Sequence, residues 1–124
     1  MKVNNFITVY NVKTKHLKEL TPDVIIETVR SLINPISYIS YDNKIKIIDK
    51  TLEESQESKY PTATRYKHFI INLIAAYTNL EIKEDDFDVL SESKMIDIIL
   101  STFKSEYEIC SNLMQMCISD LESG

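Results

Sequence analysis

Apolar residues recur at spacings of three and four along most of this chain, and this helical period constrains the fold more than any other feature. The clearest stripe lies in the C-terminal part and consists of Cys110, Leu113, Met114, Cys117, Ile118 and Leu121. A second stripe over residues 64–79 is apolar almost all round, which is typical of a central buried helix. No segment alternates strictly for long enough to build a sheet, so we expect an all-α fold.

Local start and stop signals divide the chain into about five or six helices. Thr21-Pro22-Asp23 is a typical helix start, and Asn34-Pro35 ends that helix. Ser105 with Glu108 has the spacing of a capping box, which predicts a helix start at Ser105. The remaining helices are expected over residues 40–55, 64–79, 85–90 and 94–103, with Thr62 or Thr64 as a cap and Pro61 as a stop before the central helix. We therefore expect a single compact helical domain over residues 21–124.

The first 20 residues form a separate N-terminal arm in this interpretation. Residues 5–10 favour either a short helix or a strand, because Phe6-Ile7-Thr8-Val9-Tyr10 is rich in residues with high strand propensity. Residues 16–20 are compatible with one helical turn. The arm is either ordered in the free protein or becomes ordered only on a partner during assembly.

The chain has one glycine, Gly124, and this count removes several classes of enzyme. Walker loops, dinucleotide-binding fingerprints and nucleophile elbows all need glycine where the backbone turns sharply or approaches a phosphate. His16 and His68 have no metal-ligand spacing, and Asp85, Asp86 and Asp88 lack the glycine and terminal glutamate of a calcium loop. We therefore expect no enzyme activity, no catalytic residue, no cofactor and no metal site.

Charge is distributed unevenly along the chain, whose net charge is −5. Residues 1–80 carry 11 Lys and Arg against 8 Asp and Glu, a net +3, whereas residues 81–124 carry 3 against 11, a net −8. These halves are either ordinary solvated faces or surfaces for a head-to-tail contact between copies or with a basic partner. The candidate partner-binding residues are Glu84, Asp85, Asp86, Asp88, Lys44, Lys46 and Lys50.

The cysteines and tyrosines suggest a compartment and an interface. Cys110 and Cys117 lie seven residues apart on one expected helix face, too far for a disulfide within the helix, and are expected as thiols in the core. Two thiols fit a reducing compartment, and we expect neither a signal peptide nor a membrane span. Four tyrosines near expected loops and helix edges are of the kind that interfaces favour: Tyr38, Tyr41, Tyr60 and Tyr66.

An ordered set of residues gives the chain a resemblance to a known group of proteins. The set comprises Asn5-Phe6 with Tyr10, Tyr41 with Lys44-Ile45, Arg65-Tyr66 with Phe69, the run Tyr77-Thr78-Asn79-Leu80-Glu81, Asp97, Glu108, and a Met-x-x-x-Asp-Leu ending over residues 116–121 that includes Asp120. The chain thereby resembles small acidic helical proteins from the virion and assembly gene modules of tailed phages and prophages of low-GC Gram-positive bacteria. The resemblance covers most of the chain and contains no catalytic motif.

The resemblance implies a non-enzymatic phage structural or assembly protein that acts by protein–protein contacts, such as a head–tail connector or completion protein or a tail-assembly component. The implied partners are other copies of itself and phage portal or tail proteins. No small-molecule substrate, sequence-specific nucleic acid or membrane is implied. The implied location is the virion or the cytoplasm of the infected bacterial host. The alternative is a small phage-encoded inhibitor or adaptor that binds a host protein.

Overall fold

The computed structural model of the protein describes residues 1–123; Gly124 lies outside the described residues. The expected all-α class is confirmed, since the described chain contains helices and no strand, with one isolated parallel bridge between Lys2 and Glu81. The expected number of helices is slightly low, because seven form within residues 1–123. They are α1 (Val3–Thr14), α2 (Pro22–Ile33), α3 (Tyr41–Ser55), α4 (Pro61–Tyr77), α5 (Asp86–Glu92), α6 (Ile96–Ser101) and α7 (Lys104–Ser123).

The predicted ends of α2 and the start of α3 are confirmed by their capping contacts. The Thr21 hydroxyl accepts a hydrogen bond from the Val24 amide, and the Ser40 hydroxyl accepts one from the Asn43 amide. Asn34 ends α2 with a left-handed backbone, φ 46°. In a chain with almost no glycine, asparagine is the side chain best suited to that conformation.

Two predicted helix starts are wrong, by three residues for α4 and by one residue for α7. Pro61 does not precede α4 but occupies its first turn, where the missing amide hydrogen costs nothing, so no Thr62 or Thr64 cap is needed. The predicted capping box at Ser105 is also wrong. The helix α7 already begins at Lys104, which places Ser105 inside it, and Glu108 pairs with Lys104 at 4.0 Å instead.

The N-terminal arm contains α1, so the helix alternative for residues 5–10 holds and the strand alternative does not. One face of α1 buries Val3, Phe6 and Tyr10 at helical spacing, and this apolar face prevails over local strand propensity. The Met1 ammonium donates a hydrogen bond to the Asn79 carbonyl at 2.6 Å. Residues 16–20 form no helix. That the arm orders only on a partner, and that a domain boundary lies at residue 20, stay predictions.

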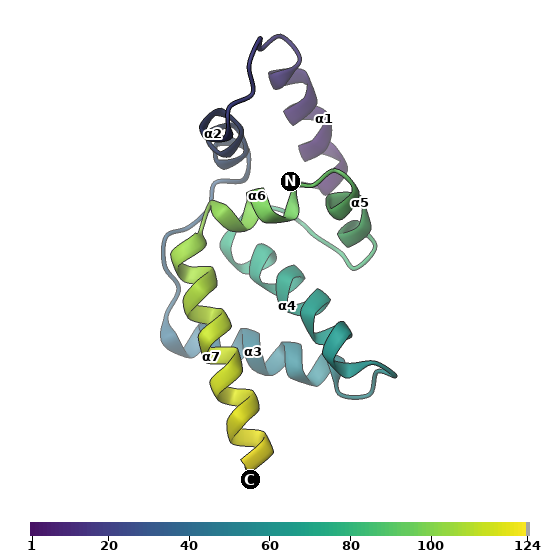
Figure 1. Cartoon of the computed structure of the whole chain (residues 1–124), viewed down its shortest axis with the longest axis vertical. Helices are drawn as coiled ribbons and strands as arrows, with labels where there is room; N and C mark the ends of the chain where they lie inside the picture. The colour runs from purple at the N-terminus through teal and green to yellow at the C-terminus, as the bar shows by residue number, and fades with distance from the viewer. Residues whose placement is uncertain (124) are drawn as a thin grey trace.

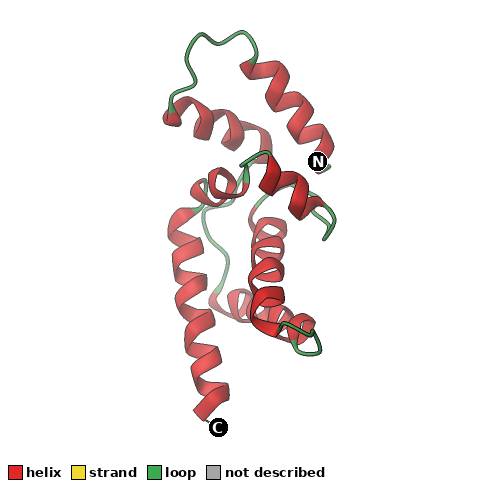
Figure 2. Ribbon diagram, turned by 45° about the vertical axis from the view of Figure 1, so that its right-hand side comes forward, coloured by secondary structure: helices red, strands yellow, loops and turns green. Residues whose placement is uncertain are grey.

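The seven helices lie in two groups along the long axis of the molecule (Figure 1). One group, α1, α2, α5 and α6, gathers near the N-terminus; the other, α3, α4 and α7, lies toward the C-terminus (Figures 1 and 2). A single apolar core joins them, and α4, as predicted for the central helix, contributes Phe69, Ile70, Leu73, Ile74 and Tyr77 to it.

The linker between α2 and α3 is tied to the C-terminal end of α4. The Ile36 amide donates to the Tyr77 carbonyl, and the Asn79 amide donates to the Ile33 carbonyl, both at 2.9 Å. These bonds fix how the two helix groups meet. Among the described residues, no helix is both long and apolar enough to cross a membrane.

Candidate functional site

The least exposed ion pair in the described chain lies in a cluster of Lys44, Tyr77, Glu106 and Cys110, here called the buried cluster. The Lys44 ammonium lies 2.8 Å from Glu106 Oε1 and donates to the Ile39 carbonyl. The same Glu106 oxygen accepts hydrogen bonds from the Tyr77 hydroxyl at 3.0 Å and from the Ile39 amide at 3.2 Å. Both charged side chains are nearly inaccessible, with 3% and 8% exposure. The cluster therefore binds the α2–α3 linker to α3, α4 and α7.

Burial and pairing act in opposite directions on the pKa of the Glu106 carboxyl, whereas both raise the pKa of the Tyr77 hydroxyl. Burial alone would raise the pKa of the Glu106 carboxyl, but hydrogen bonds from Lys44, the Ile39 amide and Tyr77 outweigh it and lower that pKa. Burial raises the pKa of the Tyr77 hydroxyl and of the Cys110 thiol. Tyr77 and Cys110 are therefore held in their protonated forms, which are poor nucleophiles, and the arrangement is suited to fixing structure.

Tyr66 of α4 lines three surface hollows, which together are called the Tyr66 groove. Two of them, of about 400 and 240 Å³, lie where α4 faces α5, α6 and α7, and the third, of about 610 Å³, lies over the α3–α4 loop and the start of α4. Its apolar walls are Tyr60, Pro61, Tyr66, Phe69, Phe87, Ile96, Tyr107 and Met114. Concave apolar surfaces of this kind are the usual places where proteins bind ligands or partner segments.

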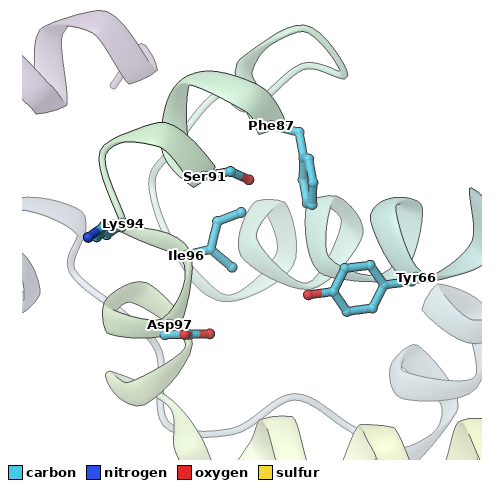
Figure 3. A pocket seen from close by; sticks show the side chains of 6 residues that line it. All are labelled: Tyr66, Phe87, Ser91, Lys94, Ile96 and Asp97. Carbon is cyan, nitrogen blue, oxygen red and sulfur yellow. The ribbon is translucent and has the colours of Figure 1, made fainter. Parts of the chain in front are cut away.

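Aromatic rings from three helices shape the Tyr66 groove. Tyr66 meets Phe87 edge to face, with ring centroids 6.4 Å apart, and Phe69 lies 6.5 Å from Tyr107. In Figure 3 the Tyr66 hydroxyl points into the hollow below Phe87, and the Asp97 carboxylate points into it from α6. Tyr66 is 62% exposed, so much of its ring is free to contact another molecule.

Three cations and one acid are among the residues that line the Tyr66 groove. Lys59, Arg65 and Lys94 line its three hollows, with Asp97 as the one acid. Within residues 1–123 none of these four side chains is engaged in an ion pair. The groove therefore offers apolar surface bordered by cations that form no ion pair among the described residues, although Lys59 lies over the Tyr60 ring.

The predicted acidic residues lie together at the start of α5, as a segment called the acidic segment: Glu84, Asp85, Asp86 and Asp88. Glu84 lies 3.4 Å from the Lys67 ammonium, and Asp86 accepts a hydrogen bond from the Lys83 amide at 2.9 Å. Over residues 1–123 no three His, Cys, Asp or Glu side chains are grouped so that they could hold a metal ion. Partner binding by this segment stays a prediction.

The predicted basic residues do not form one surface. Lys46 and Lys50 are exposed on α3, but Lys44 is buried in the ion pair with Glu106. Lys44 is therefore corrected from a surface position to an internal one, because its ammonium has a carboxylate partner inside the protein. Partner binding by Lys46 and Lys50 stays a prediction.

Sequence reasoning missed Glu106, Phe87 and Tyr107 as members of these sites. A signal for the buried cluster exists in the sequence. Glu106 precedes Cys110 and Met114 at intervals of four, on the buried face of α7. A charged residue in phase with an apolar stripe indicates a buried ion pair, whereas no local pattern indicates which aromatic rings will meet across three helices.

Comparisons of the chain with protein-family models, with curated proteins and with solved structures find no significant match.

Proposed function

We propose that this chain is a non-enzymatic phage structural or assembly protein, of the head–tail connector, completion or tail-assembly kind, that works through protein–protein contacts. The observation that carries the proposal is the Tyr66 groove, an exposed aromatic surface bordered by cations that have no ion-pair partner among the described residues. Tyrosine and arginine together are typical of the centres of protein interfaces. The resemblance described above supplies the phage context.

The distribution of polar groups supports contact rather than turnover as the role. The buried cluster has its hydrogen bonds satisfied, and burial keeps Tyr77 and Cys110 protonated. The Tyr66 groove contains neither of the two histidines nor either cysteine. Asp97 is the one carboxylate that lines the groove, and within residues 1–123 its side chain makes no hydrogen bond to Ser91 or Tyr66, whose hydroxyls line the same hollow.

The proposal is tested by two measurements on the purified chain. Light scattering after size exclusion, at low and high salt, measures the solution mass, and a salt-sensitive oligomer supports self-assembly through the unlike halves. A tagged copy is then used to capture partners from lysates of phage-infected and uninfected cells, with the proteins identified by mass spectrometry. Portal, head or tail proteins support the proposal. A single host enzyme captured from both lysates would instead support the inhibitor or adaptor alternative.

A further inference from the structure

We propose that the Tyr66 groove of one copy binds the exposed C-terminal end of α7 of a second copy, in a head-to-tail contact. This inference rests on the proposed function and specifies the surfaces through which copies would join. Its two surfaces are the Tyr66 groove and the helix end formed by residues 116–123, called the α7 end.

The α7 end carries apolar side chains that the other helices do not cover. Cys110 and Met114 lie on the buried face, and Leu121 follows Met114 on that same face by two turns. Leu121 is nevertheless 69% exposed, and Met116 is 61% exposed. Figure 1 shows the end of α7 projecting past α3 and α4. The helix therefore presents apolar surface that the described part of its own chain leaves largely uncovered.

The charges of the two surfaces are opposite. Asp120 and Glu122 are the only charged residues of the α7 end, and within residues 1–123 neither forms an ion pair. The border of the Tyr66 groove carries the cations Lys59, Arg65 and Lys94 against the single acid Asp97. An acidic amphipathic helix end is thus matched to an aromatic groove with a positive border, a form of helix-in-groove recognition.

The occupant comes from another copy because the α7 end cannot reach its own groove. Tyr107, Ser111, Met114 and Gln115 of α7 line the groove, and the same continuous helix then carries residues 116–123 away from it. The two contacting surfaces are different parts of the molecule, so the contact is heterologous. Such contacts form closed rings or open filaments, depending on the rotation between copies.

The experiment uses one variant for each surface. The groove variant is Arg65→Glu, with Tyr66→Ala as a second version, and the end variant is Leu121→Glu. Each variant alone is expected to associate at least about tenfold more weakly than the wild-type chain, measured by light scattering over a concentration series. Tyr41→Ala is the matched control, because Tyr41 is also an exposed tyrosine, at 60%, but lies outside the groove.

Mixing the variants tests the head-to-tail geometry directly. An equimolar mixture of groove and end variants contains one intact groove and one intact helix end, so it is expected to form a dimer that grows no further. A charge exchange adds a rescue: Asp120→Lys with Glu122→Lys is expected to restore binding to the Arg65→Glu groove. Far-ultraviolet circular dichroism verifies that every variant stays folded.

Three results would overturn the inference. They are a wild-type chain that is monomeric at every concentration, folded variants that keep the wild-type mass, and a mixture that forms no dimer although each variant alone has lost association. The proposed function fails separately, when capture from infected lysate yields no phage structural protein. A monomeric chain that still captures portal or tail proteins therefore removes the α7 contact and leaves the proposed function in place.

Discussion

The buried cluster and the acidic segment both carry charged side chains, but their environments are opposite. In the buried cluster, Lys44 and Glu106 are 3% and 8% exposed and share four polar contacts with Ile39 and Tyr77 or with each other. In the acidic segment, Glu84 is 62% exposed and its ion pair with Lys67 is long, at 3.4 Å. Each charge in the buried cluster thus depends on its partner for solvation, whereas water can solvate the carboxylates of the acidic segment.

This difference teaches that the density of charge along a sequence says little about its structural importance. Exposed ion pairs contribute roughly 0–1 kcal/mol, because water and salt screen them and their side chains lose freedom on pairing. Breaking a buried pair costs about 3–5 kcal/mol, because the remaining charge has no water to solvate it. Substitution of one buried Lys or Glu is therefore expected to change the free energy of unfolding more than substitution of the exposed acids.

The largest expected effect is that of Lys44→Ala, which leaves Glu106 buried with a missing partner. We expect the free energy of unfolding to fall by about 3–5 kcal/mol, measured by urea unfolding followed by circular dichroism. Lys46→Ala, two residues along the same helix but exposed, is the matched control and is expected to change stability by less than about 0.5 kcal/mol.

The pair can also be removed as a whole. A double variant, Lys44→Met with Glu106→Leu, is expected to recover part of the loss, since neither charge is then left unpaired. Equal losses of unfolding free energy in Lys44→Ala and Lys46→Ala would contradict this reasoning. They would show that the buried pair stabilises the protein no more than an exposed charge does.

Tyr77→Phe is expected to have the next largest effect. The substitution removes the hydroxyl that donates to Glu106, and a hydrogen bond to a charged group contributes about 1.5–3 kcal/mol. The ring keeps its stacking on Phe103, 4.8 Å between centroids, so the measured loss in urea unfolding reports the hydroxyl alone. Tyr41→Phe, at an exposed tyrosine, is the control, and a loss of the same size there would contradict this reasoning.

A smaller, pH-dependent effect is expected from the lowered pKa of Glu106. A carboxyl whose pKa is lower in the folded state than its ordinary value of 4.5 contributes stability that is complete above that value. The contribution is lost as the pH falls below 4.5 and through the lowered pKa. The difference in unfolding free energy between the wild-type chain and Glu106→Gln should therefore narrow in acid and stay constant from pH 6 to 8, as measured by urea unfolding at each pH. A difference that stays constant through the acid range would contradict this prediction.

Much of the fold could be predicted from local patterns in the sequence. Thr21-Pro22 and Ser40 set helix starts through contacts within one turn, and Asn34-Pro35 ends a helix by restricting its own backbone. Such signals need no knowledge of the rest of the chain. The predicted cap at Ser105 is wrong because such a signal ignores the neighbouring helix. The short turn after α6 allows α7 to begin one residue earlier, and no local signal at Ser105 reveals this.

The two sites depended on contacts between distant segments and could not be predicted in the same way. Lys44 and Glu106 are 62 positions apart, and the ion pair forms only because α3 and α7 pack together. The Tyr66 groove likewise requires α4, α5 and α7 to bring Tyr66, Phe87 and Tyr107 together. The sequence indicated the exposed tyrosines singly, but spacing along one helix cannot show which rings become neighbours across three.

The smallest effect on stability is expected from neutralising the acidic segment with Asp85→Asn, Asp86→Asn and Asp88→Asn together. Asparagine keeps an oxygen that can accept the Lys83 amide hydrogen bond at position 86, and the other two side chains make no ion pair among the described residues. The unfolding free energy should therefore change by less than about 0.5 kcal/mol, with helicity unchanged.

Light scattering on the same variant then tests whether these carboxylates take part in association. A lower solution mass than wild type at equal stability supports their predicted partner contact, whereas an unchanged or higher mass indicates a solvated face and leaves the proposed contact through the Tyr66 groove to its own variants.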